Sequence, residues 1–218
     1  MCKPVKLHNH NDERIDLMAA VTLKPIAKRL MMFGIRGTSP LIMHQWSEKA
    51  LREMRDKQQS GKKTKTRELR KPDEEAKAAT YTTDDGDIGI PGMAFKSALV
   101  TAAHKDIGIE KTLVRKALFL RTNDSNKVLP ITCDEPVVRE DCVRVGAGSA
   151  DLRYRPEFKE WKCQISMDVD SELLQAESVL ALVSRAGFGV GICEWRPEKG
   201  GEYGRFEIDP DVPVTFEE

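Results

Sequence analysis

Apolar residues along the chain fall into short runs that end at glycine, proline, asparagine or aspartate, a pattern typical of strands joined by turns. The run 29–37 ends in glycine and predicts a buried strand. Residues 161–169 alternate between apolar and polar, which predicts a half-exposed strand of a sheet. Further strands are predicted at 113–122, 127–132, 136–145, 151–158 and 205–210.

Three segments carry the apolar spacing or the flanking signals of a helix. Residues 47–58 predict a helix that Ser47 is placed to cap. Residues 93–105 follow the turn Ile-Gly-Ile-Pro-Gly directly and present small side chains on one face. Residues 170–187 give the clearest helical stripe, and Gly187 is expected to end that helix.

The order of these elements is strand, helix, strands, helix, strand, with two large insertions. It predicts an α+β fold with a ferredoxin-like, RRM-like βαββαβ core, in which two helices cover one face of an antiparallel sheet. RNA-recognition modules share this topology and bind single strands on the open face. We expect one domain over 1–218, with an N-terminal arm at 1–27, an exposed basic insertion at 47–79 and a hairpin insertion at 136–162.

Composition narrows the class of protein. Lys plus Arg and Asp plus Glu both number 35, so bulk positive charge cannot carry nucleic-acid binding, although a local basic groove still can. No apolar run is long enough for a membrane span, and we expect a cytoplasmic protein that contacts no membrane. The 5 cysteines are widely spaced without a CxxC pair, so we expect reduced thiols, no zinc and no cofactor.

The strongest chemical signal is the glycine-rich segment 187–204 before the last strand. Glycines let a backbone approach a phosphate chain and expose its amides as donors, and Trp195 and Tyr203 offer flat faces for bases. The alternative is a tight structural turn with Trp195 capping the core. The candidate contacts are Gly187, Gly189, Gly191, Arg196, Lys199, Gly200, Gly201 and Arg205.

Other cations extend this candidate interface. The segment 57–71 holds seven basic side chains and one acidic one, so it is either a solvated linker or a contact to phosphates. The hairpin mixes basic and aromatic residues, but interleaved acids would explain its charges equally well by cross-strand pairing. Lys96 sits at the start of the helix that follows Ile-Pro-Gly. The cations concerned are Lys62, Lys63, Lys65, Arg67, Arg144, Arg153 and Arg155.

Signals of catalysis are weak. Asp84, Asp85 and Asp87 form an acidic cluster that could hold a divalent metal, but such clusters are more often plain turns. The histidines are scattered, and no phosphate-binding P-loop motif is present. We therefore expect a protein without catalytic residues or a metal site.

Two motifs resemble the RAMP superfamily of CRISPR effector subunits. GDIGIPGMAFKSALVTAA resembles its Ile-Pro-Gly helix signature, and AGFGVGICEWRPEKGGEYGRFEI resembles its glycine-rich loop. The resemblance is to the repeated backbone subunit that lines guide RNA, and the chain is also similar to an uncharacterised tailed-phage family. It implies that Lys96, Arg205 and the loop contact nucleic acid, with 136–160 as a thumb-like hairpin. Met93-Ala94-Phe95 departs from the usual Ser-Ser-Leu.

The sequence thus favours a non-catalytic protein that binds single-stranded RNA or DNA and assembles side by side into a homo-oligomeric filament. Its partners would include other effector or phage subunits, in antiviral defence or in a phage. One alternative is an interaction protein without nucleic acid, such as a mimic of an effector subunit. Another is a Mg-dependent ribonuclease that uses Asp84, Asp85 or Asp87.

Overall fold

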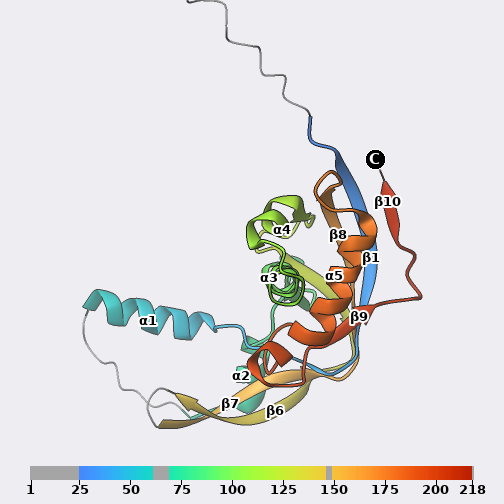
Figure 1. The fold of residues 1–218 in the computed structure, drawn as a ribbon. Coiled ribbons are helices and arrows are strands. Elements are labelled where there is room, and N and C mark those ends of the chain that lie inside the picture. The colour runs from blue at the N-terminus through green and yellow to red at the C-terminus, as the bar shows by residue number, and fades with distance from the viewer. Residues whose placement is uncertain (1–24, 61–68, 146–148, 218) are drawn as a thin grey trace, which may run out of the picture.

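The computed structural model describes residues 25–60, 69–145 and 149–217. Most of the predicted arm at 1–27 lies outside this range, and so do Lys62, Lys63, Lys65 and Arg67. Figure 1 shows one body built on a sheet, with a hairpin and a helix reaching out from it.

The main sheet is antiparallel throughout and has β1 (Lys28–Gly37) and β8 (Trp161–Asp170) at its centre. Beyond β8 lie β4 (Leu118–Leu120), β5 (Val128–Cys133) and β3 (Gly89–Pro91). Beyond β1 lie β9 (Phe206–Ile208) and β10 (Thr215–Glu217). In the βαββαβ core, the last strand, β9, pairs with the first, β1, and β1 pairs with the third strand, β8. This arrangement confirms the predicted ferredoxin-like α+β order.

Two helices cover one face of this sheet, as predicted. They are α3 (Gly92–Ala102) and α5 (Ala176–Arg185), which continue as single π-helical turns at Ala103–Ile107 and Ala186–Val190. Alternation along β1 and β8 turns one set of side chains toward the helices, and the large residues of that set are fully buried. The core includes Met31, Phe33, Ile35, Phe95, Leu99, Ile165 and Val183.

Two sequence predictions were wrong in detail. Residues 113–122 were expected as a strand, but α4 (Lys111–Ala117) precedes the short β4, since Val114 and Ala117 lie on one buried helical side. The helix expected at 170–187 begins only at Ala176, because β8 continues to Asp170. Gly187 lies inside the helical extension instead of ending it.

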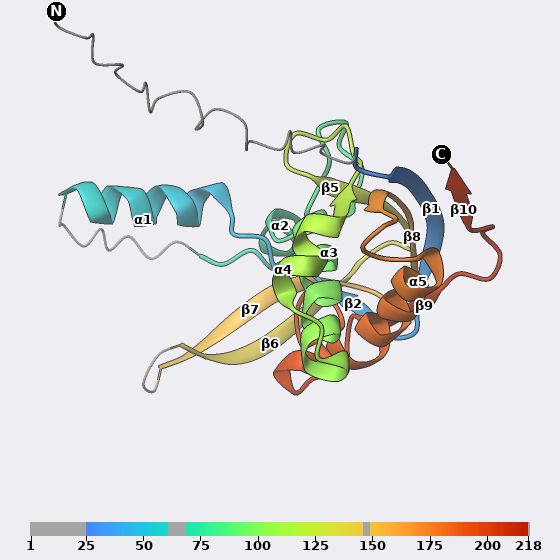
Figure 2. The ribbon, with the colours of Figure 1, turned by 45° about the horizontal axis from the view of Figure 1, so that its top comes forward.

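The hairpin is built from β6 (Val137–Val145) and β7 (Ser149–Phe158), and β2 (Leu41–Ile42) pairs with the base of β7. Helix α2 (Pro72–Ala78) packs on this second sheet. Helix α1 (Glu48–Ser60), which follows Ser47 as predicted, projects away from the body in both ribbon views (Figures 1 and 2).

Candidate nucleic-acid interface

The glycine-rich segment runs from the end of α5 to β9 and is clamped by residues 38–42. The amide of Gly204 donates to the Pro40 carbonyl at 2.8 Å, and the amide of Glu194 donates to the Ile42 carbonyl at 3.0 Å. The Thr38 amide in turn donates to the Arg205 carbonyl at 2.9 Å. The sequence reading missed this clamp, because nothing in Thr-Ser-Pro-Leu-Ile signals a partner so far along the chain.

The expected cradle of free glycine amides is contradicted by these hydrogen bonds. Besides Gly204, the amides of Gly191, Gly200 and Gly201 each donate to a carbonyl of the same chain, at 2.8, 2.9 and 3.2 Å. A phosphate would have to displace those bonds. The glycines shape the segment instead: a Cβ on Gly187 would collide with the Phe206 carbonyl oxygen. Only Gly189 and Gly200 of the predicted set leave open space above them.

Two aromatic side chains of the segment stand out from the surface. Phe188 is 73% exposed, and the Arg205 guanidinium lies 5.0 Å from its ring centroid. Trp195 is 42% exposed. Its φ of 53° is positive, so the backbone turns at this residue and is not extended. The sequence reading named Trp195 but missed Phe188, although a phenylalanine between two glycines at the end of a helix was a signal for exposure.

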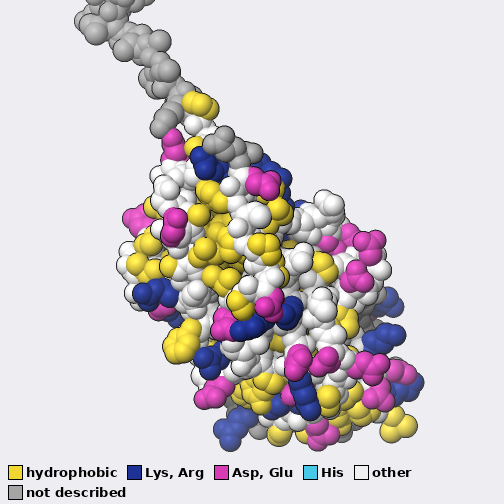
Figure 3. Space-filling view, turned by 90° about the vertical axis from the view of Figure 1, so that its right-hand side faces the viewer, with side chains coloured by type: hydrophobic (Ala, Val, Ile, Leu, Met, Phe, Trp, Pro, Cys, Tyr) yellow, Lys and Arg dark blue, Asp and Glu magenta, His cyan; other side chains and the backbone are white. Residues whose placement is uncertain are grey.

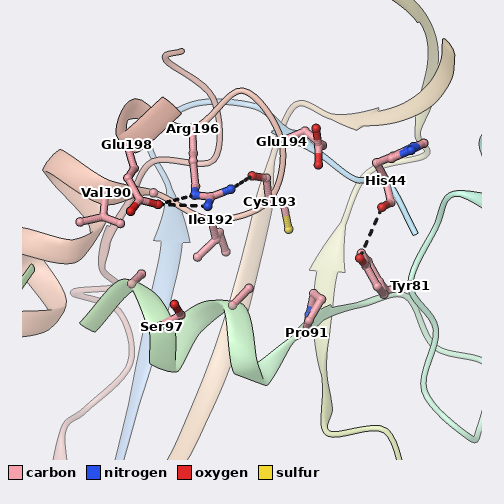
Figure 4. Close-up of a pocket in the computed structure, with 13 residues that line it drawn as sticks. His44, Tyr81, Pro91, Ser97, Val190, Ile192, Cys193, Glu194, Arg196 and Glu198 are labelled. Atoms are coloured by element: carbon pink, nitrogen blue, oxygen red, sulfur yellow. Dashed lines mark hydrogen bonds and ion pairs between the residues drawn. The ribbon is translucent and has the colours of Figure 1, made fainter. Parts of the chain in front are cut away.

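The other polar side chains of the segment differ in whether residues of the same chain already bind them. Lys199 is exposed. Arg196 is held by the Glu198 carboxylate at 3.0 Å and by the Cys193 carbonyl at 2.9 Å (Figure 4). Tyr203 is engaged by Arg139, which donates to its hydroxyl at 3.1 Å and stacks at 4.9 Å from its ring. Trp195, Phe188, Lys199 and Arg205 are therefore the groups that a ligand can reach.

A pocket of about 220 Å³ lies between the segment and α3 (Figure 4). Its walls include Ala94 and Ser97 of α3 on one side and Ile192 and Glu194 on the other. Burial raises the pKa of the Cys193 thiol to about 12, so this lining thiol stays protonated. The Cys193 thiol is therefore not activated as a nucleophile, and the charged groups of the wall are Glu194, Glu198 and Arg196.

Lys96 lies apart from this pocket. Its ammonium donates to the Arg115 carbonyl at 3.0 Å and sits 4.4 Å from the ring centroid of Phe119. Burial, together with Arg115, lowers the pKa of Lys96. The structure therefore places the Lys96 ammonium at the Arg115 carbonyl and the Phe119 ring, and its contact with a phosphate stays a prediction.

The hairpin arginines have different surroundings. Arg155 is 95% buried, and its guanidinium lies 3.2 Å from Asp141 and 3.6 Å from Glu194, so a phosphate cannot reach it. Arg153 contacts Asp151 and the Nε2 atom of His44. Cross-strand and local ion pairing therefore accounts for both, as the alternative interpretation held. Arg144 is exposed near the tip of the hairpin.

The acidic turn joins two loops. The Asp84 carboxylate accepts from the amide and the hydroxyl of Ser125 at 2.7 and 2.8 Å. Asp124 accepts from the Val128 and Asp84 amides, and the Val128 amide bond lowers the pKa of Asp124. Within the described residues, no group of three or more His, Cys, Asp or Glu side chains is placed to hold a metal ion.

The second face of the main sheet is less open than expected. The loop between β9 and β10 lies over Gly34 of β1, where a Cβ would be 2.8 Å from the Val212 side chain. Its cations are paired with acids: Arg36 with Glu207, Arg121 with Asp168 and Lys162 with Asp209. On the side that carries β10, acidic and basic side chains are intermixed without a broad area of one sign (Figure 3). This face offers little attraction to a phosphate chain.

Comparisons with known proteins add a distant likeness. No family model and no curated protein matches the chain. Among solved structures it is similar to a chain of the Type III-B Cmr-beta bound to cognate target RNA, with a TM-score of 0.41 and 8% identity over 86% of this chain. It is also similar to Cmr6 from Pyrococcus furiosus, with a TM-score of 0.42 and 11% identity over 85% of this chain and 100% of that one.

The chain spans 60% of the length of the Cmr-beta chain it matches. Similarities at these TM-scores carry no argument about function. The likeness to a tailed-phage family stays a prediction. Separately, none of the helices in the described residues has the length and apolar character needed to cross a bilayer.

Proposed function

We propose that this chain binds single-stranded RNA or DNA without cutting it, through the side chains of the glycine-rich segment. The observation that carries this proposal is the exposure of Phe188, with the Arg205 guanidinium over one side of its ring. A single exposed aromatic side chain is common on protein surfaces, so the argument rests on the pairing of this ring with a cation and not on its exposure alone. Aromatic faces with adjacent cations are the recurring means of holding unpaired bases and their backbone.

Trp195 and Lys199 extend the same contact along the segment. Trp195 supplies a second flat surface, and exposed Lys199 supplies a cation that no rigid pair fixes in place. The body of the segment is held by the clamp from residues 38–42, so both aromatic groups stand on a rigid support. Such preorganisation lowers the entropy cost of binding.

The wider part of the proposal concerns assembly. The resemblance of residues 85–104 and 180–208 to the RAMP superfamily supports a role like that of an effector backbone subunit, stacked side by side on a nucleic acid. In that role other effector subunits, or phage subunits, would be its partners. The Asp84 carboxylate accepts hydrogen bonds from the Ser125 amide and hydroxyl, and this structural role supports a protein that binds without cleaving.

Fluorescence anisotropy with labelled single-stranded RNA and DNA tests the binding function. Stacking contributes about 1–3 kcal/mol per base, so we expect Phe188→Ala and Trp195→Ala each to weaken binding by about 5- to 150-fold. Trp46→Ala removes a tryptophan that is 56% exposed outside the segment and is the matched control. Equal affinity of all four proteins would refute the proposed site, and absence of binding would favour an interaction protein.

The same oligonucleotides, incubated with Mg²⁺ or Mn²⁺ and resolved on a gel, test the non-catalytic part. We expect intact RNA at protein concentrations that saturate binding. Cleavage that Asp84→Asn or Asp87→Asn abolishes would replace this part of the proposal with the ribonuclease alternative.

A further inference from the structure

Strand β6 is the outer strand of the hairpin that reaches out from the body (Figure 2). The order of its sheet is β2, β7, β6, so the 9 residues Val137–Val145 have a strand partner on one side only. Among the described residues, no backbone hydrogen bond outside the ladder with β7 involves this stretch. Such an edge presents a row of amides and carbonyls to which another strand can be added.

The charges on one face of β6 are already neutralised within the chain. Arg139 and Asp141 are half-buried and buried, and they form an ion pair at 2.8 Å. Asp141 also accepts from the buried Arg155 at 3.2 Å. This face therefore needs no charge from a second molecule.

The other face of β6 keeps its charges exposed. Glu140, Cys142 and Arg144 alternate with the buried positions and are all exposed. Across the ladder with β7, Glu140 faces Tyr154 and Arg144 faces Ala150, so neither has an opposite charge as its cross-strand neighbour. An incoming strand that supplied those charges would be favoured over one that did not.

A second copy of β6 supplies them in one register. Two identical antiparallel strands pair about a two-fold axis through one residue, because hydrogen-bonding positions must face each other. An axis at Cys142 places Glu140 opposite Arg144 of the second copy, and this pair occurs twice. An axis at Glu140 or at Asp141 would instead place two like carboxylates opposite each other, which is unfavourable.

We propose that β6 of two copies of this chain pair as antiparallel neighbours about a two-fold axis at Cys142. The two three-stranded sheets then join into one continuous sheet, held by backbone hydrogen bonds and two pairs of Glu140 with Arg144. The contact is isologous and closes at two copies. It goes beyond nucleic-acid binding, and the side-by-side assembly of the proposed function would need a different surface.

Sedimentation velocity of the full chain, under reducing conditions and without nucleic acid, tests the dimer. We expect a monomer–dimer equilibrium. Glu140→Arg and Arg144→Glu should each raise the dimer dissociation constant by at least about tenfold, since two attractive pairs become two repulsive ones. Glu53→Arg and Arg52→Glu make the same charge changes at exposed positions of α1 and should dimerise like the unchanged protein. A protein that stays monomeric at its highest soluble concentration overturns the proposal.

Mixing the two variants gives the sharpest result. In a mixed dimer, each arginine of Glu140→Arg faces a glutamate of Arg144→Glu, so the mixture should form one-to-one dimers about as tightly as the unchanged protein. A mixture that stays monomeric overturns the register. Any variant that circular dichroism shows to be unfolded is replaced by Glu140→Lys or Arg144→Asp.

Disulfide cross-linking tests the position of the axis. Residues directly opposite in antiparallel strands have Cα atoms about 4.5–5.5 Å apart, within the range that a disulfide spans. Mild oxidation should therefore link the unchanged dimer, and Cys142→Ser should prevent the link. Glu140→Cys in the Cys142→Ser background should not cross-link, because the two positions 140 lie about 14 Å apart. Cross-linking of that variant instead would overturn the proposed register.

The dimer and the nucleic-acid site are measured independently. Phe188→Ala and Trp195→Ala should dimerise like the unchanged protein, because neither residue belongs to β6. A loss of dimerisation in both of these variants would overturn the assignment of the interface to β6.

Discussion

Arg155 of β7 and Glu194 of the glycine-rich segment lie 3.6 Å apart, guanidinium to carboxylate, and join the hairpin to the body of the fold. Arg155 also contacts Asp141 on the neighbouring strand at 3.2 Å. Arg139 adds a second link, since it reaches Asp141, Glu157 and Tyr203. The hairpin and the candidate interface are therefore held in one orientation by charged groups, of which Arg155 and Asp141 are buried and Glu194 is partly exposed.

This network predicts unequal costs for its two carboxylates. Asp141→Ala leaves Arg155 buried with only a half-exposed partner, so we expect a loss of about 3 kcal/mol in the free energy of unfolding. Glu194→Ala removes a carboxylate that is 39% exposed, and water can replace it, so we expect a loss below about 1 kcal/mol. Urea denaturation measures both, and equal losses would contradict the assigned burial of the network.

His44 predicts a pH dependence of stability. Burial, followed by the nearby Arg155 and Arg153, lowers the pKa of His44 below its ordinary value. The unfolded chain then binds the proton more readily than the folded one, so the stabilising contribution is complete above the ordinary pKa and is lost as pH falls. The Arg153 guanidinium lies 2.7 Å from Nε2 of His44, which fits a neutral ring accepting there.

The measurement compares unfolding free energies from roughly pH 7.5 to pH 5.5, a range that brackets the ordinary imidazole value near 6.5. We expect the unchanged protein to lose more stability over this range than His44→Gln does. His104→Gln, at an exposed position, should follow the unchanged protein. The same pH slope in all three proteins would show that His44 is not the responsible group.

The sequence was sufficient for the core of the fold and insufficient for the site. Alternation in 161–169 predicted a half-exposed strand, and the runs at 29–37 and 205–210 predicted a buried strand and the last strand; all three are present as β8, β1 and β9, because burial on one face imposes such spacing directly. The segment 113–122 failed because Leu113, Val114 and Ala117 satisfy a short helix and a strand almost equally. Short apolar runs do not decide between the two.

The site depended on contacts between distant parts of the chain. Whether Arg155 is a surface cation or a buried one is decided by Asp141 and Glu194, and its neighbours in sequence do not reveal this. The Gly204 amide was counted as free because its acceptor, the Pro40 carbonyl, lies far earlier in the chain. The amides of Gly191, Gly200 and Gly201 donate to carbonyls a few residues before them, in tight turns that the glycine pattern alone did not specify. Phe188 lies in the π-helical turn at Ala186–Val190, where Ala186, Gly187 and Val190 are buried and Phe188 is exposed.

Alanine substitutions at two glycines of the segment distinguish an effect on packing from an effect on binding. Gly204 has a φ of +64°, and a Cβ there would collide with the Ile192 carbonyl oxygen, so we expect Gly204→Ala to cost about 2–4 kcal/mol of unfolding free energy. Gly189 has nothing within 4 Å of such a Cβ and lies in the helical turn, so Gly189→Ala should be neutral or stabilise by up to about 1 kcal/mol.

Thermal or urea unfolding of both glycine variants gives the comparison, and anisotropy follows on those that fold. Gly189→Ala should keep its affinity within about twofold, because stacking on Phe188 and Trp195 does not need a ligand to approach the backbone here closely, and the added Cβ blocks only such an approach. If Gly189→Ala abolished binding while the protein stayed folded, the backbone and not the aromatic side chains would be the contact.

The basic segment predicts how salt affects binding. Each phosphate contact on a single strand contributes about 0.7 to the slope of log affinity against log salt concentration. Replacing four cations with alanine should therefore lower that slope by up to about 3 if all of them contact phosphates. The four are Lys62, Lys63, Lys65 and Arg67.

A variant with four other lysines replaced controls for the change in net charge. These are Lys111, Lys116, Lys127 and Lys159, all of which are exposed and lie outside the glycine-rich segment. We expect this control to bind more weakly at low salt, because the whole protein becomes more acidic, but to keep its slope since no phosphate contact is lost. Equal slopes for both variants would identify 57–71 as a solvated linker and leave binding to the glycine-rich segment alone.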